Sequence, residues 1–339
     1  MTEWTPEVVR IGSIRPHPNK DNPDPKYRCD TLSYTDVYGG YPVLFRTGEF
    51  KEGDLAAYIP IDTLVPTDRT EFAFLGESNR IKARRMRGMF SMGMLVPAPE
   101  GSKEGDSVVD VFDLKKYEPA EERLKMATGV AVPGPEGWDF PKYTDIEGLR
   151  KHKHVLVHGE DVVLTEKIHG QNARFCWDPD EKKLWVGSRT VIKKRDGEIN
   201  WWHVANKLDL EEKLAKFPRT VFFGEVYGKS IQDLTYGLDH KSLRIFDTYD
   251  TLKCRYNDWD DTVRLVAEAG LELVPVLYRG PWKGFEMHAP LAEGTSTLSE
   301  HVREGYVVKP VKERAAHCGR VVFKHIGEGY LLRDEKKRK

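Results

Sequence analysis

The chain has 339 residues, of which 39% are hydrophobic and 32% charged, and a formal net charge of -1 at pH 7. Its length predicts two domains, and its near-zero net charge means that only clustered charge can indicate a nucleic-acid surface. Four scattered cysteines without a CxxC pair argue against a disulfide framework or a zinc site. No apolar run could span a membrane, and MTEWTPEVVR lacks a signal-peptide pattern. We therefore expect a cytoplasmic or otherwise intracellular, soluble protein.

Residues 1–115 contain short strand-like runs that are broken by Gly, Pro and Asp at close spacing. The main runs are EVVRIGSI, YRCDTLS, YPVLFRT, DLAAYIPIDTLVP and GMLVPA. A meander of this kind without a long helical period is typical of a small β-barrel. We assign residues 1–115 to a first domain of that type.

A cluster of basic residues interrupts this region, where residues 80–87 read RIKARRMR. A strand with Met89, Phe90, Met92 and Met94 follows it. Charge beside a strand protects a sheet edge from pairing, but a basic and partly apolar face can also bind a nucleic-acid backbone. The segment alone supports both interpretations equally. The candidate nucleic-acid residues, called the basic cluster below, are Lys82, Arg84, Arg85 and Arg87.

Residues 116–140 differ in composition from the regions on either side. KKYEPAEERLKMATG predicts a short helix, and VAVPGPEGWDFPKY is rich in Pro and Gly. That composition is typical of a linker, so we place the domain boundary there.

Residues 141–339 carry longer strand-like runs, and ARFCWDPDEKKLWVGSR predicts a hairpin with DPDEKK as its turn. Helical periods appear in NWWHVANKLDLEEKLAKF and NDWDDTVRLVAEAGL, the second capped by Asn257 or Asp258. Strands and helices do not alternate one for one. The pattern therefore favours an α+β fold over a doubly wound parallel sheet.

The segment LTEKIHG ends a strand with Lys167 and then bends at a glycine. A lysine before a turn is usually a solvated surface residue, and the short pattern alone is weak. Four other segments strengthen it. FFGEVYG places Glu225 where a carboxylate could meet a ribose or a divalent cation. RIFDTY places Phe246 where a ring could stack on a purine or pack in the core. EGYVVKP and GRVVFKHI each bring a lysine, Lys309 and Lys324, onto a strand face shared with a valine.

These segments resemble the ordered motifs of the covalent nucleotidyltransferases, the family of polynucleotide ligases and mRNA capping enzymes. The matching stretches are KIHG, the SR of GSRT, FGEVYG, IFDTY, EGYVVK and VVFK. KIHGQN and EGYVVKP are especially similar to the phage and RNA-editing RNA ligases. A β-barrel ahead of the motifs resembles the Deinococcus-type RNA ligases. The resemblance implies an N-terminal OB-like barrel and, at 141–339, an ATP-grasp-like adenylyltransferase domain of antiparallel sheets with flanking helices.

The resemblance implies an ATP-dependent RNA ligase that joins 3′-OH and 5′-phosphate ends through a lysyl-AMP and an adenylylated RNA 5′ end. The resemblance also implies Mg²⁺ or Mn²⁺ as the metal cofactor and a nicked duplex with an RNA 3′-OH strand as the substrate. It implies that the enzyme is a monomer. The implied catalytic residues are Lys167, as nucleophile, with His169, Asn172, Lys309 and Lys324. The implied ATP contacts are Glu166, Lys167, Arg189, Glu225, Phe246, Val307, Lys309 and Lys324. The implied metal ligands are Glu225 and Glu304.

One position departs from the related phage enzymes, whose last motif reads KxK. Here Val322 takes the place of the first lysine, so Lys324 alone remains, with Lys312 or Arg320 as candidate substitutes and His325 expected to face solvent. A free lysine is protonated at neutral pH, and nearby cations and a metal ion are expected to lower the pKa of the nucleophile.

Three alternatives remain. An mRNA capping guanylyltransferase or a DNA ligase would use the same lysine chemistry. A member of a different class would be an OB-type nucleic-acid binder whose nucleotidyltransferase domain is inactive. The intact Lys167, Glu225, Glu304 and Lys309 argue against the binder.

Overall fold

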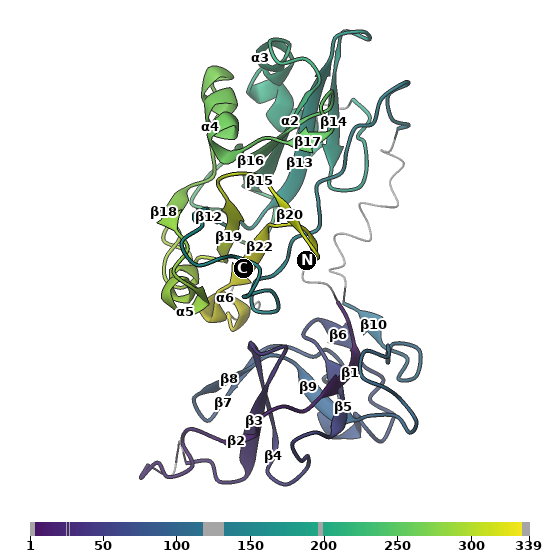
Figure 1. Ribbon diagram of the computed structural model, residues 1–339. Coiled ribbons are helices and arrows are strands. Elements are labelled where there is room, and N and C mark those ends of the chain that lie inside the picture. Colours follow the sequence, from purple (N-terminus) through teal and green to yellow (C-terminus); the bar gives the residue numbers. More distant parts are fainter. Residues whose placement is uncertain (1–3, 25, 27, 118–131, 196–198, 334–339) are drawn as a thin grey trace. The chain divides into compact units, whose positions relative to one another are not determined.

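The computed structural model describes residues 4–24, 26, 28–117, 132–195 and 199–333. The chain divides into two compact units, residues 1–128 and 129–339 (Figure 1). Most of the helix predicted in KKYEPAEERLKMATG lies outside the described residues. Within the described ranges, no helix is both long and apolar enough to cross a membrane.

The first unit is built from short antiparallel strands. Its three-stranded sheets are β1-β5-β9 and β2-β3-β4, and its two-stranded sheets are β10-β6 and β7-β8. The bounds are Glu7–Arg10 (β1), Arg15–Pro16 (β2), Leu32–Val37 (β3), Tyr41–Arg46 (β4), Leu55–Ile59 (β5), Thr63–Leu64 (β6), Arg84–Met86 (β7), Met89–Ser91 (β8), Met94–Pro97 (β9) and Lys115–Lys116 (β10), with a 3₁₀ turn η1 at Ala73–Leu75.

Alternating burial explains why these runs form strands. In β3 every second side chain of LSYTDV is buried, as expected of a strand in a sheet with one covered face. Two apolar clusters fill the interior, one around Phe72 and Val96 and the other around Val43 and Phe45. The predicted strand through Met89–Met94 is divided into β8 and β9, because Gly93 adopts a positive φ between them.

The second unit contains two five-stranded sheets, ordered β11-β22-β19-β12-β18 and β14-β13-β15-β16-β17. All neighbours are antiparallel except the parallel pair β11 and β22. The first sheet comprises Glu147–Gly148 (β11), Asp161–Glu166 (β12), Val276–Pro281 (β18), Gly305–Pro310 (β19) and Phe323–Ile326 (β22). The second comprises Gln171–Asp178 (β13), Lys183–Ser188 (β14), Thr220–Gly228 (β15), Lys241–Asp250 (β16) and Arg255–Tyr256 (β17). Ala315–Ala316 (β20) and Gly319–Arg320 (β21) form a separate hairpin.

Helices accompany these sheets (Figure 1). Their bounds are Asn200–Lys207 (α2), Leu210–Leu214 (α3), Trp259–Glu268 (α4), Phe285–His288 (α5) and Glu328–Leu331 (α6), with a 3₁₀ turn η2 at Ala289–Ala292. The apolar faces of α2 and α3 pack on the second sheet through Trp202, Val204 and Leu214. Both predicted helical periods and the predicted β13–β14 hairpin are present. The α+β expectation is therefore confirmed.

Strand register brings the motifs of the first sheet together. In the pairing of β12 with β19, Val163 lies opposite Lys309 and Thr165 opposite Val307. In the pairing of β19 with β22, Val307 lies opposite Lys324. A β-sheet places residues that are far apart in sequence about 5 Å apart across the strands. Lys167, directly after β12, therefore lies next to the start of β19.

Two glycines allow the backbone to close tightly around this point. Gly305 has φ +151°, and a Cβ there would lie 2.0 Å from the carbonyl oxygen of His325. A Cβ at Gly170 would lie 2.4 Å from the carbonyl oxygen of Val226. Because a side chain cannot occupy either space, both motif glycines are required by close backbone approach.

Candidate active site

Lys167 lies at the end of β12 and faces two carboxylates. Its backbone N–H donates to the carbonyl of Gly305 at 3.0 Å, which fixes the residue beside β19. Its Nζ donates to Oε1 of Glu304 at 2.7 Å, and its side chain is 26% exposed. The predicted nucleophile is thus held by an ion pair in a position that solvent can still reach.

The pKa of Lys167 is raised, opposite to the expectation from the sequence. Burial by itself lowers this pKa, but the negative charges of Glu304 and Glu225 outweigh the burial. The expectation considered the nearby cations and a metal ion, but it did not include the carboxylates of Glu304 and Glu225, which the fold brings next to Lys167. The ligand-free protein therefore holds its lysine as an ammonium ion.

Glu225 joins this group from the second sheet. It lies on β15 opposite Asn172 of β13, and the backbone N–H of Gly170 donates a hydrogen bond to its carboxylate. Burial raises the pKa of Glu225 to about 8 despite the opposing effect of Lys167. Two carboxyl groups, those of Glu225 and Glu304, thus flank the lysine.

Two buried oxygens at this place have no hydrogen-bond partner in the described part of the chain. They are Oε2 of Glu304 and Oδ1 of Asn172. An unpartnered buried acceptor is costly, and a bound ligand or cation would satisfy it. The set of oxygens from Glu225, Glu304 and Asn172 is of the type that Mg²⁺ and Mn²⁺ prefer. The residues present therefore fit a divalent cation.

His169 is held on both ring nitrogens. Its Nε2 lies 2.7 Å from Oδ1 of Asp233, and its Nδ1 lies 2.8 Å from the hydroxyl of Tyr330. Its backbone N–H donates to the hydroxyl of Tyr236 at 2.7 Å. The carboxylate favours the tautomer with the proton on Nε2, and the Tyr330 hydroxyl then donates to Nδ1. Asp233, Tyr236 and Tyr330 were not among the predicted site residues, because they lie outside the six motifs.

Lys309 sits deeper and shares a carboxylate with an arginine. Its Nζ donates to Oδ1 of Asp247 at 2.8 Å, while Arg320 donates to Oδ2 at 2.6 Å. The hydroxyl of Tyr143 donates to Oδ2 at 2.9 Å. Burial alone would raise the pKa of Asp247, but Arg320 and Lys309 lower it, whereas burial lowers the pKa of Lys309. Asp247 thus stays ionised and holds both cations in place.

The candidates for the missing motif lysine take different positions. Arg320 is tied to Asp247 and to Glu313, and Lys312 is 81% exposed and paired with Asp258. Val322 is buried, as an aliphatic residue in the core should be. His325, which was expected to face solvent, is also buried, and burial lowers its pKa to about 3.

Lys324 is the remaining lysine of the last motif. It is buried on β22, where it lies opposite Val307. Burial lowers the pKa of Lys324 to about 7, and the positive charges of Lys167 and Arg189 act in the same direction. A lysine of this kind is only partly charged at neutral pH, and an anion such as a phosphate next to it favours its charged form.

The other predicted ATP contacts are placed as follows. The carboxylate of Glu166 is buried and accepts hydrogen bonds from Ser296 and Thr297, so it holds the 296–297 loop. Phe246 lies edge-on to Tyr143, with ring centroids 4.9 Å apart. Val307 is half-buried, and Arg189 forms an ion pair with Asp145.

The basic cluster lies in the first unit, on β7 and in the residues directly before and after it. All four of its side chains are exposed. Arg87 Nη1 donates to the carbonyl of Lys26 at 2.6 Å, and Arg85 Nη1 donates to the carbonyl of Gly88 at 3.2 Å. The charged groups therefore remain at the surface, while the backbone contacts fix the direction of two of them.

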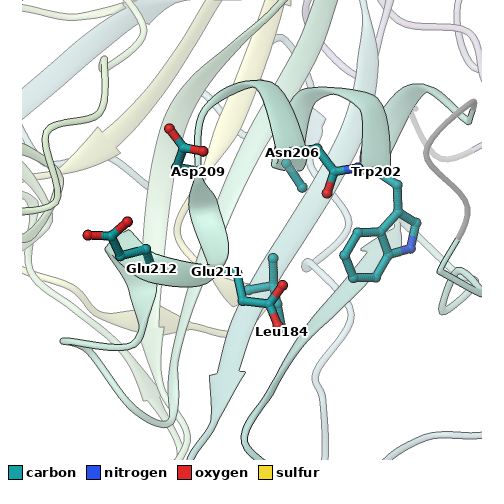
Figure 2. A pocket seen from close by; sticks show the side chains of 7 residues that line it. Leu184, Trp202, Asn206, Asp209, Glu211 and Glu212 are labelled. Atoms are coloured by element: carbon teal, nitrogen blue, oxygen red, sulfur yellow. The ribbon is translucent and has the colours of Figure 1, made fainter.

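A separate cavity of about 210 Å³ lies against α2 and α3 (Figure 2). Its lining includes Asp209, Glu211 and Glu212 and none of the motif residues. Three carboxylates disfavour a polyphosphate ligand. This cavity is therefore not a candidate for the nucleotide site.

Comparisons with known proteins agree with this architecture. Residues 160–326 match the RNA ligase family model, and residues 20–98 match an OB-fold domain. A mutant of Naegleria gruberi RNA ligase with ATP and Mn has a TM-score of 0.81 at 23% identity, covering 97% of this chain and 98% of that chain. The same ligase with PPi has a TM-score of 0.79 at 23% identity, covering 99% and 100%. A comparison with curated proteins found no match.

The structural likeness at this identity establishes a common fold. The family match covers the region that contains Lys167, Glu225, Glu304, Lys309 and Lys324. Residues 160–326 are thus a domain of the RNA ligase family, preceded in this chain by an OB-fold domain.

Proposed function

We propose that this protein is an ATP-dependent RNA ligase that seals nicks in duplexes whose 3′-OH strand is RNA. The observation that supports this most directly is Lys167, which is paired with Glu304 in a site that also contains Glu225 and Lys324. A half-buried lysine, a carboxylate with an unfilled acceptor oxygen and additional cations suit covalent transfer of a nucleotide. The ligase structures with ATP and Mn, AMP and Mn, or PPi are consistent with this proposal.

In the first step, Nζ of Lys167 attacks the α-phosphorus of ATP. An N–P bond forms, the bond from that phosphorus to the bridging oxygen breaks, and pyrophosphate leaves. The ion pair with Glu304 must open first, and the ammonium must lose a proton, because only the neutral amine carries a lone pair. The raised pKa of Lys167 makes the free enzyme unreactive and ties activation to nucleotide binding.

In the second step, the AMP moves from Lys167 to the 5′-phosphate of the nucleic acid. In the third, the 3′-OH attacks that activated phosphate and AMP leaves. Lys309 and Lys324 are the proposed contacts for the phosphoryl oxygens, and a compact ammonium suits this role. Asp247 keeps Lys309 in position, and Asp233 with Tyr330 keeps His169 in position, for the later steps.

Glu225 and Glu304 are the proposed ligands of the divalent cation. When bound, Mg²⁺ or Mn²⁺ would stabilise negative charge on the phosphoryl oxygens and on the leaving group. The unpartnered Oε2 of Glu304 is the atom most ready to accept it.

Choice of an RNA 3′-OH end has a physical basis. The terminal 2′-OH both donates and accepts, so a polar site can distinguish RNA from DNA through it. It also favours an A-like sugar pucker that aligns the 3′-OH for in-line attack. A deoxynucleotide would leave the partners of that hydroxyl unsatisfied, which can cost several orders of magnitude in rate.

The test uses ATP or GTP labelled at the α-phosphate, a divalent metal and a denaturing gel. Wild-type protein should become labelled from ATP, and Lys167→Ala and Lys167→Arg should not. Lys253→Ala is the matched control, because that lysine is 68% exposed and forms its ion pair with Asp250. Labelling from GTP alone would indicate a capping enzyme, and no labelling would indicate a binding protein.

A panel of nicked duplexes then tests the substrate. The nicks differ only in the sugars at the 3′-OH and 5′-phosphate ends. Sealing should require ribose at the 3′-OH end and should accept RNA or DNA at the 5′-phosphate end. Equal sealing rates with ribose and deoxyribose at the 3′-OH end would contradict the RNA ligase assignment and favour a DNA ligase.

A further inference from the structure

Two segments that are distant in sequence meet beside β22 and bring soft metal ligands together. KHKH at residues 151–154 follows β11, and His317–Cys318 form the turn of the β20–β21 hairpin. Donor atoms of His152, His317 and Cys318 all lie within 4.8 Å of one another. None of these residues belongs to the site described above.

The ring of His152 is oriented as it is in many metal sites. Its Nε2 is hydrogen-bonded to the carboxylate of Glu147, and its ring stacks on Phe323 with centroids 5.2 Å apart and planes 14° apart. Histidine ligands in metal sites commonly donate their second ring N–H to a carboxylate, which fixes the tautomer and makes the other nitrogen a better ligand. In this arrangement Nδ1 of His152 is the nitrogen available to an ion.

The other two donors lie at the surface, where an ion could enter. His317 is exposed, Cys318 is half-buried, and the ring of His317 stacks on His154 with centroids 5.6 Å apart and planes 12° apart. Cys318 is not in a disulfide. Ligand atoms around Zn²⁺ lie roughly 3.5 Å apart, given bond lengths of about 2.0–2.3 Å. Rotation of the His317 and Cys318 side chains on this turn can bring the donor atoms from within 4.8 Å of one another to that shorter distance.

We propose that Nδ1 of His152, an imidazole nitrogen of His317 and the thiolate of Cys318 bind one Zn²⁺ ion, with solvent as the fourth ligand. Two nitrogens and one sulfur form a set that selects Zn²⁺ over Mg²⁺ or Mn²⁺. The proton of the Cys318 thiol leaves to solvent as the sulfur binds. The scattered cysteines without a CxxC pair argue against a zinc site in the sequence. That spacing does not show that residues 152 and 317–318 lie close together in the fold.

The ion would connect two segments that border the proposed active site. Leu149 donates to the carbonyl of Lys324, so the first segment is attached to the strand of that lysine. Arg320, two residues after Cys318, holds Asp247. Zinc bound here would restrict the motion of two segments, the one hydrogen-bonded to the strand of Lys324 and the one that carries Arg320. The ion would not contact the nucleotide.

The test uses full-length, reduced and metal-free protein titrated with Co²⁺. One equivalent should produce a thiolate-to-cobalt absorption band, and Zn²⁺ should abolish it. Cys318→Ser, on the exposed turn, and His152→Ala should lack the band. Glu147→Gln should keep it and weaken the affinity by roughly 10–100-fold. Absence of a band in the reduced wild type would overturn the proposal.

Two controls separate this site from other thiols and from the active site. Cys254→Ser removes the one cysteine in the described chain that is exposed, and it should keep the band. Glu304→Ala removes an oxygen donor of the proposed Mg²⁺ or Mn²⁺ site and should also keep it. A band that survives Cys318→Ser, or disappears in Cys254→Ser, would assign the metal to another sulfur and refute the site.

Discussion

Replacement of Glu304 by glutamine tests why the resting enzyme holds its lysine protonated. The amide has the shape of the carboxylate and can still accept a hydrogen bond from Nζ of Lys167, but it carries no charge. Burial then acts against the charge of Glu225 alone. We expect the pKa of Lys167 to fall in Glu304→Gln.

The distance sets the size of the effect. A full charge pair at 2.7 Å is worth about 6 kcal/mol at an effective dielectric constant of about 20. Solvent reaches the lysine, whose side chain is 26% exposed, so this figure is an upper limit. A fall of about one to three pH units is the range expected for loss of an adjacent charge. A lysine whose pKa falls is neutral, and therefore reactive, over more of the range above neutral pH.

The assay is competitive acylation of lysines across pH, resolved by peptide mass spectrometry. It reports the fraction of neutral Lys167 without ATP or metal, so loss of a metal ligand does not obscure the result. The labelling curve of wild-type Lys167 should rise at higher pH than that of a lysine in an unstructured reference peptide. In Glu304→Gln it should shift to lower pH.

The matched control is Glu268→Gln, which removes a carboxylate that pairs with Arg264 on the surface of α4. Its labelling curve for Lys167 should coincide with the wild-type curve. If Glu304→Gln leaves that curve unchanged, the ion pair does not govern the lysine, and the account of a charge-locked resting state is wrong.

Three further perturbations test other parts of the molecule. Asp247→Asn should cost about 3–5 kcal/mol in urea unfolding, because it leaves Lys309 without its buried counter-charge and leaves Arg320 with Glu313 in place of two acidic partners; a cost below about 1 kcal/mol would contradict this. Burial raises the pKa of Glu225 to about 8, so the folded state binds the proton more tightly and loses stability as pH rises from about 4.5 to 8. Glu225→Gln should flatten this decline and add about 1 kcal/mol or more at pH 8, and equal slopes in both proteins would count against it. Neutralising the basic cluster should lower the log–log salt dependence of RNA binding by about one unit for each phosphate that the protein no longer neutralises, and an unchanged slope would assign the cluster to edge protection.

The sequence by itself determined the kinds of element and the order of the chemistry. Short apolar runs such as YPVLFRT and the Gly- and Pro-rich turns predicted the small strands of the first unit, and the helical periods predicted α2 and α4. Six motifs in order predicted an RNA ligase domain, which the family match to residues 160–326 confirms. Alternation along EGYVVKP also predicted the face shared by Val307 and Lys309, because side-chain direction in a strand is a local property.

Only the tertiary structure decided which charges meet. Glu304 is 137 residues from Lys167, and Asp247 is 62 residues from Lys309. The partners of His169 and the meeting of His152 with Cys318 are also distant in sequence. These contacts depend on strand register and on how loops close over the sheets, and a shift of one residue in register would turn each side chain to the other face. A pKa depends on the balance of burial against charges only a few ångströms away, so even its direction at Lys167 could not be read from the order of residues.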